Sequence, residues 1–274
     1  MRRALVKIFV AGAVMLAATS VPHAAFAQGS FDARYTLSVN GFPLGKFTWQ
    51  AQFGLADYNA SATGRASGIF SMLLNGEGTV SVKGIVKDAR PQATNYVSAF
   101  TREKEKSGVQ MTLDAGRVRD LKIEETDPDT DRIPVTDAHK LDIADPLTAL
   151  LLPAPASDPV SASACERKLS IFDGRRRFDL ALSFRRNDKA TPDKGYTGPA
   201  LVCAVKFTPI AGHRASSPLL TFLIEGRDIE IWFVPVAGMR LLAPVRLSIA
   251  SGIGTMLLRA DQFETSAGFL SGRI

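Results

Sequence analysis

Apolar and polar residues alternate along most of the chain beyond residue 30, which is the pattern of strands with one buried face. Between residues 35 and 39, for example, Tyr35, Leu37 and Val39 alternate with polar residues, and Asn40-Gly41 follows as a tight turn. The same period predicts further strands at 44–53, 79–86, 110–113, 117–123, 168–172, 175–184, 201–207, 219–224, 229–234, 241–249 and 256–263. We therefore expect antiparallel strands joined by short turns, with their inward side chains forming one shared interior.

The dipeptide Asp173-Gly174 predicts a hairpin, because it is of the type preferred in two-residue turns whose central residues have positive φ. Such a turn places Leu169 opposite Phe178. It also places Lys168 opposite Asp179, as an ion pair on the polar face. In this register the buried row of the second strand is Phe178, Leu180, Leu182 and Phe184.

Two short segments interrupt the two-residue period. Residues 69–75 (IFSMLLN) fit a helical turn or an apolar loop against the sheet. Asp145 is a good N-cap, Pro146 is tolerated at the first helical position, and apolar residues follow at helical spacing up to residue 152. The sequence thus predicts an all-β fold: a strongly curved antiparallel sheet, or half-open barrel, with short plug helices at 69–75 and 146–152.

Residues 1–27 have the three-part plan of a secretory signal peptide. Three basic residues precede an apolar run at 8–18, which is too short to span a membrane. Small residues at the −3 and −1 positions predict cleavage between Ala27 and Gln28. We expect an exported protein whose mature chain, 28–274, is a single β-rich domain.

Removal of the signal peptide changes the charge of the protein. The full chain has 33 basic and 27 acidic residues and a formal charge of +6. The mature chain keeps 30 of the basic residues and all of the acidic ones, so its charge is +3. An excess this small gives no basis for nucleic-acid binding.

Cys165 and Cys203 are the only cysteines, and in an exported protein the expectation is that they pair. By the hairpin register both thiols point into the core. If their strands flank the 178–184 strand on opposite sides, the Cα atoms are about 9–10 Å apart, beyond the ~7 Å limit for bridging. The segment around Cys165 must then leave the sheet for the bond to form. Two buried, inert thiols are the alternative.

No stretch of the sequence has the spacing of a catalytic, metal or nucleotide site. The acidic residues of 127–131 lack the glycine and the closing glutamate of a calcium loop. His139 and His213 belong to no metal-binding spacing, and we interpret both as surface or loop residues. Arg175–Arg177 reads as solvated strand residues, except that Arg176 continues the inward row. Arg176 could therefore reach a carboxylate or a ligand head group at the rim.

Four stretches carry a resemblance to a known family: 35–37 (YTL), 41–46 (GFPLGK), 145–147 (DPL) and 172–180 (FDGRRRFDL). They resemble the periplasmic family of unknown function numbered 3108, in its proteobacterial form. The resemblance implies a Gram-negative periplasm and a curved sheet similar to the periplasmic lipoprotein carriers, which wrap a half-open barrel around a helical plug. The family brings no established activity and no functional residues.

These observations lead to three hypotheses of function. The first is a monomeric, non-enzymatic cell-envelope protein without a cofactor, at most peripheral to the membrane, that binds a lipid or a lipoprotein on the apolar face of its sheet. The second is an interaction module that contacts an envelope protein through an exposed apolar patch or sheet edge. The third is a hydrolase, which requires two buried acids with shifted pKa values in one cleft.

Overall fold

The computed structural model describes residues 29–66, 76–102, 105–125, 131–225, 228–252 and 254–268. The predicted signal peptide, with its cleavage between Ala27 and Gln28, lies outside these residues. So does the helical turn expected at 69–75. Within the described part of the chain, no helix combines the length and the hydropathy needed to cross a lipid bilayer.

Fifteen strands of the described chain form one large sheet, which is antiparallel along its whole order of neighbours, β7-β6-β5-β4-β3-β2-β1-β15-β14-β13-β12-β10-β9. The short strands β8 and β11 pair with β14 and β15. The strands are β1 (Gly29–Val39), β2 (Phe42–Phe53), β3 (Asp57–Ala66), β4 (Gly76–Lys87), β5 (Arg90–Arg102), β6 (Glu105–Asp114), β7 (Arg117–Glu125), β8 (Leu152–Pro153), β9 (Arg167–Phe172), β10 (Arg177–Ala190), β11 (Lys194–Gly195), β12 (Gly198–Ala211), β13 (Asp228–Pro235), β14 (Leu241–Ser251) and β15 (Gly254–Ala267).

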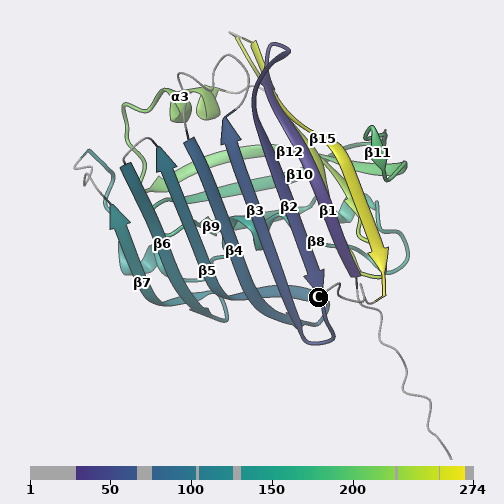
Figure 1. Ribbon diagram of the computed structural model, residues 1–274, viewed down its shortest axis with the longest axis horizontal. Helices are drawn as coiled ribbons and strands as arrows, with labels where there is room; N and C mark the ends of the chain where they lie inside the picture. Colours follow the sequence, from purple (N-terminus) through teal and green to yellow (C-terminus); the bar gives the residue numbers. More distant parts are fainter. Residues whose placement is uncertain are drawn as a thin grey trace, which may run out of the picture.

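The sheet bends so strongly that its two halves face each other. Figure 1 shows β10 and β12 crossing behind β3 to β6, at a steep angle to them. The outermost strands, β7 and β9, do not pair with each other in the described residues, so the sheet remains open rather than closing into a barrel. This arrangement confirms the predicted all-β fold with a strongly curved antiparallel sheet, whose curvature comes from the twist of successive strands.

The first and last strands pair in the middle of the sheet. β1 lies between β2 and β15, and its register with β15 runs from Gly29 opposite Ala267 to Val39 opposite Met256. The two halves of the sheet are therefore joined through a long-range pairing of strands from opposite ends of the described chain.

The turn at Asp173-Gly174 is longer than predicted. Phe172 pairs with Arg177, so four residues rather than two form the turn between β9 and β10. The Asp173 carboxylate accepts hydrogen bonds from the backbone N–H groups of Arg175 and Arg176, at 2.9 and 2.6 Å. An aspartate that bonds its own backbone in this way stabilises the wider turn.

The wider turn shifts the predicted hairpin register by two residues. Leu169 lies opposite Leu180, and Lys168 lies opposite Ala181. Because side chains alternate with a period of two, an even shift leaves each one on its expected face. Lys168 still forms the expected ion pair with Asp179, at 2.7 Å across the diagonal.

The apolar interior of the described chain forms two clusters, which corrects the expectation of one shared core. Alternate residues of β12 belong to different clusters: Val202 to the larger one, Leu201 and Cys203 to the smaller one. Alternate residues point to opposite faces of a strand, so β12 is buried on both faces. The chain between β8 and β9 covers the second face. The smaller cluster consists of Leu152, Ala154, Ala164, Cys165, Leu182, Leu201, Cys203, Ile231, Phe233 and Leu242.

The second cluster also changes the outcome for β10. Of the predicted buried row, Leu182 is buried in the smaller cluster, but Phe184 is 40% exposed because β10 extends beyond the segment that covers it. Arg177 and Asp179, expected at a solvated surface, are buried instead. There Asp179 accepts a hydrogen bond from Arg177, and Ser170 adds another at 3.1 Å.

The helices are short. α2 (Pro146–Ala149) begins at the predicted N-cap, but it ends before residue 152 because Leu152 and Pro153 pair with β14 as β8. α3 (Pro218–Glu225) occupies the segment 219–224 that was predicted to be a strand (Figure 1). Its apolar run (LLTFLI) lacks a clear period of two, and such runs fit a helix or a strand. Two 3₁₀ turns, η2 (Asp137–Lys140) and η3 (Ala162–Ala164), are the remaining elements of the described residues.

Candidate functional site

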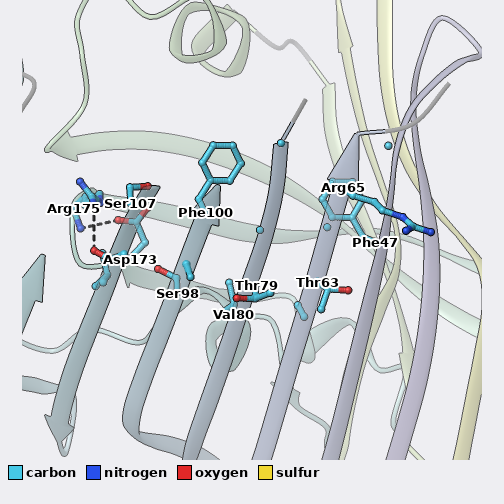
Figure 2. Close-up of a pocket in the computed structure, with 18 of the residues that line it drawn as sticks. Phe47, Thr63, Arg65, Thr79, Val80, Ser98, Phe100, Ser107, Asp173 and Arg175 are labelled. Atoms are coloured by element: carbon cyan, nitrogen blue, oxygen red, sulfur yellow. Dashed lines mark hydrogen bonds between the residues drawn. The ribbon is translucent and has the colours of Figure 1, made fainter. Parts of the chain in front are cut away.

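A hollow of about 670 Å³ opens on the face of β1 to β6 that also carries the larger apolar cluster. Figure 2 shows its lining side chains along neighbouring strands. The turn between β9 and β10, with Asp173 and Arg175, closes one end. Strands of one half of the bent sheet and a turn of the other half therefore contribute to this space.

Small residues leave this space unfilled. On the inward face near the hollow, β3 presents Ala62, Gly64 and Ala66, and β4 presents Gly76 and Gly78. Farther along the same strands, the same face carries large buried side chains, among them Tyr58 and Val82. Protein interiors are normally close-packed, so a change from large to small side chains along adjacent strands produces a cavity.

Apolar side chains form the walls of the hollow. Phe47 on β2 and Phe100 on β5 lie on either side of the small residues, as Figure 2 shows. Phe100 is 47% exposed, so an aromatic ring faces both the hollow and the solvent. The remaining apolar lining comes from Leu37, Leu44, Val80, Tyr96 and Val109.

The turn between β9 and β10 is held against β6 and β7. Arg175 donates hydrogen bonds from its guanidinium to the carbonyl oxygens of Gly108, at 3.2 Å, and Glu124, at 2.8 Å. Gly174 has a φ of +90° and lies directly on the Val109 side chain, where a Cβ atom has no room. The close approach of this turn therefore depends on a glycine.

Arg176, the residue predicted at the rim, lines the hollow from this turn rather than from a regular strand position. Its side chain is 47% exposed, and its guanidinium is 4.0 Å from the Asp173 carboxylate. Arg132 lines the same end and donates a hydrogen bond to the carbonyl oxygen of Gly212, at 3.0 Å. The tertiary fold thus brings together arginines that are far apart in the sequence.

The two histidines lie in different environments. His139 accepts a hydrogen bond from the backbone N–H of Thr136 and caps η2, which agrees with its interpretation as a loop residue. His213 is 8% exposed and packs against the rings of Phe178 and Phe207, so its side chain is buried rather than on the surface. Burial lowers the pKa of His213, and the positive charge of the nearby Arg176 lowers it further.

Cys165 and Cys203 form the expected disulfide bond, with their Cα atoms 5.5 Å apart. Cys165 follows η3 and precedes β9, which begins at Arg167. It is therefore outside the sheet, and the separation imposed by two flanking strands does not apply. The bond fixes the segment that covers the second cluster onto β12.

Asp145 is fully buried at the N-terminal end of α2, where it is the N-cap. Its Oδ1 atom accepts hydrogen bonds from the N–H groups of Leu147 and Thr148, at 3.0 and 3.1 Å, and burial raises the pKa of its carboxyl group. Asp145 does not line the hollow, whose described lining contains Asp173 as its sole acid. The hydrolase hypothesis requires two acids in one cleft, so this site does not support it. The described residues also contain no group of three or more potential metal ligands.

Comparison with known proteins assigns a family without an activity. A family model described as "Protein of unknown function (DUF3108)" matches residues 34–261. No curated protein and no solved structure matches the chain. The geometry of the hollow is consequently the main basis for a functional proposal.

Proposed function

Since the chain belongs to the DUF3108 family of unknown function, we propose that it is a non-enzymatic cell-envelope protein that binds a lipophilic ligand in the hollow on its curved sheet. The observation that carries this proposal is the row of small residues on β3 and β4 beneath walls of apolar side chains. The volume of about 670 Å³ falls within the range of pockets that bind small molecules.

The proposed setting is the periplasm of a Gram-negative cell, reached after cleavage between Ala27 and Gln28. The bond between Cys165 and Cys203 is compatible with an oxidising compartment. We further propose that the protein is structurally related to the lipoprotein carriers. Its open, curved sheet with the short plug helix α2 is the architecture that the resemblance to those carriers implied. A lipid or the acyl chains of a lipoprotein are the ligands that this comparison suggests.

The interaction-module alternative has less support. Exposed large apolar side chains of the described residues are distributed over separate elements. They include Phe42 on β2, Ile85 on β4, Val97 on β5, and Ile224 on α3. Scattered apolar residues of this kind are normal on protein surfaces.

Filling the hollow tests the proposal. A Cβ atom at Gly78 would have ordinary contact with the Phe100 ring, its nearest neighbour at 3.5 Å, so Gly78→Val is compatible with the fold. Its methyl groups would occupy the hollow. Ser81→Val is a matched control, because Ser81 is exposed on the opposite face of the same strand.

The measurement is the fluorescence of N-phenyl-1-naphthylamine, a neutral apolar probe, added to the folded protein. We expect wild type and Ser81→Val to bind the probe with equal affinity and Gly78→Val to bind it at least about tenfold more weakly, since the lost contact area is apolar. Circular dichroism confirms that each variant is folded. A folded wild type that binds no probe, or equal binding by both variants, contradicts the proposal.

A further inference from the structure

The two ends of the hollow differ in charge. Four of the described lining residues are arginines, whereas Asp173 is the sole acid. Arg65 lies at the β3 end, and Figure 2 shows its side chain extending away from the turn. Arg132, Arg175 and Arg176 line the end closed by the turn between β9 and β10. Positive charge is thus concentrated at one end of an otherwise apolar space.

The acid at this end is already engaged by the backbone. Asp173 Oδ1 accepts the N–H groups of Arg175 and Arg176, which fixes the shape of the turn. Its Oδ2 is 4.0 Å from the Arg176 guanidinium, too far for a hydrogen bond. Arg176 therefore has a half-exposed guanidinium at the edge of the hollow that Asp173 contacts only through a long ion pair.

Backbone hydrogen bonds fix the positions of Arg132 and Arg176, the two arginines to which we assign ligand binding below. The segment carrying Arg132 pairs with the loop after β12: Ile133 donates its N–H to the carbonyl oxygen of His213, and Gly212 donates to that of Ile133. Arg176 is held by the turn and by the pairing of Asp173 N–H with its carbonyl oxygen. Gly212, whose carbonyl oxygen accepts the hydrogen bond from Arg132, packs against the backbone of Arg175 and Arg176, which places Arg132 and Arg176 near one another.

We propose that the ligand is an anionic amphiphile, whose carboxylate or phosphate group binds Arg132 and Arg176 while its apolar chain extends over the small residues of β3 and β4. This inference rests on the proposed function and specifies its ligand class. Guanidinium groups bind carboxylates and phosphates through paired hydrogen bonds, and such bonds are strongest beside low-dielectric walls. A chain leading from that end meets Val109, Tyr96 and Val80 before it reaches Phe47.

The first test compares two probes that differ only in charge: 11-(dansylamino)undecanoic acid and its methyl ester. We expect the wild-type protein to bind the acid at least about tenfold more tightly than the ester, the gain expected for a partly desolvated ion pair. Arg176→Gln and Arg132→Gln should each reduce this preference to about threefold or less, without a change in ester affinity. Arg34→Gln is the matched control, because Arg34 is an exposed arginine on β1 that does not line the hollow, and it should retain the full preference.

The outcomes separate this inference from the proposed function. Equal binding of acid and ester by wild type overturns the anionic ligand and leaves lipophilic binding intact. If the folded wild-type protein binds neither the acid nor the ester, the proposed function itself is overturned. A preference for the acid that survives both Arg176→Gln and Arg132→Gln overturns the assignment of the head-group site.

Competition identifies the source of the anion. Oleate carries a carboxylate and lysophosphatidate a phosphate, each on a single acyl chain, and displacement of the dansyl acid by either supports the proposal. Inorganic phosphate at millimolar concentration should not displace it, because it lacks the chain. Displacement by inorganic phosphate as effective as that by the lipids would show a simple anion site and overturn the amphiphile.

Discussion

Replacement of the buried Asp145 separates two roles of its side chain, helix capping and charge. Asparagine retains the Oδ1 acceptor for the N–H groups of Leu147 and Thr148, whereas alanine removes it. The second side-chain atom of the two residues also corresponds: the uncharged amide nitrogen of asparagine replaces Oδ2 of the protonated acid. Asp145 Oδ2 has no hydrogen-bond partner among the described residues. Asp145→Asn therefore removes only the cost of burying a charge, and Asp145→Ala removes the cap.

The capping role gives the expected size of the alanine effect. Loss of an N-cap costs about 0.5–2 kcal/mol, and the buried N–H of Thr148, left without an acceptor, adds about 1–3 kcal/mol. We expect Asp145→Ala to lower the free energy of unfolding by about 1.5–5 kcal/mol. At about 2–4 °C per kcal/mol for a chain of this size, Tm falls by about 3–20 °C. Asp145→Asn should be at least as stable as wild type at neutral pH.

The charge role predicts a pH dependence with a definite sign. The carboxyl group ionises near pH 4 in the unfolded chain, while burial raises its pKa in the folded protein. Between these values the folded state holds a proton that the unfolded state releases. The contribution of Asp145 to stability therefore falls as pH rises through this interval and then levels off. Asp145→Asn lacks this contribution.

Urea unfolding followed by tryptophan fluorescence measures the difference, because Trp49 and Trp232 are both buried. The unfolding free energy of Asp145→Asn minus that of wild type should increase between about pH 4 and about pH 8. Other titrating groups contribute equally to both proteins and cancel. A difference that is constant or decreases with pH, or an Asn variant as unstable as Asp145→Ala, would refute the reasoning.

Two further predictions concern the disulfide and the turn at the hollow. The bond between Cys165 and Cys203 spans 38 residues, so the double alanine variant should lose about 4 kcal/mol in urea unfolding; a loss below about 1 kcal/mol would contradict this. Gly174→Ala combines a positive φ with a clash against Val109 and should cost about 1–3 kcal/mol in thermal unfolding. It should also weaken binding of the dansyl acid more than that of N-phenyl-1-naphthylamine, and unchanged binding of both would show that the turn position does not matter.

The sequence predicts the sheet well where large apolar residues alternate with polar ones, as in β1 and β2. β3 escaped prediction because its inward residues beyond Tyr58 are alanine and glycine, which give a weak hydrophobic signal. The same residues form the base of the hollow. One property of the sequence therefore concealed both a strand and the candidate site.

The second cluster was missed for a different reason. An alternating pattern describes a strand with one buried face, whereas β12 and β13 contain continuous apolar runs, ALVCAV and IWFV. Such runs are typical of strands buried on both faces. These runs could have predicted that a further segment covers the second face of β12 and β13, as residues 150–165 do. No local signal in the sequence indicates that Arg132 and Arg176 line the same hollow, because this depends on the bend of the whole sheet.

The pairing of β1 with β15 has a consequence for how the molecule assembles. β15 pairs with both β1 and β14. Until β15 has been synthesised, β1 and β14 each have an edge of unpaired backbone groups, and the two halves of the sheet cannot join. Topologies dominated by such distant pairings fold slowly. The same geometry favours circular permutation: a short linker from residue 267 to residue 29 would connect neighbouring strand ends. New termini could then be placed in a turn such as Ala115-Gly116. In the permuted protein β15 and β1 would be neighbours in sequence, so their pairing would form early in folding instead of last.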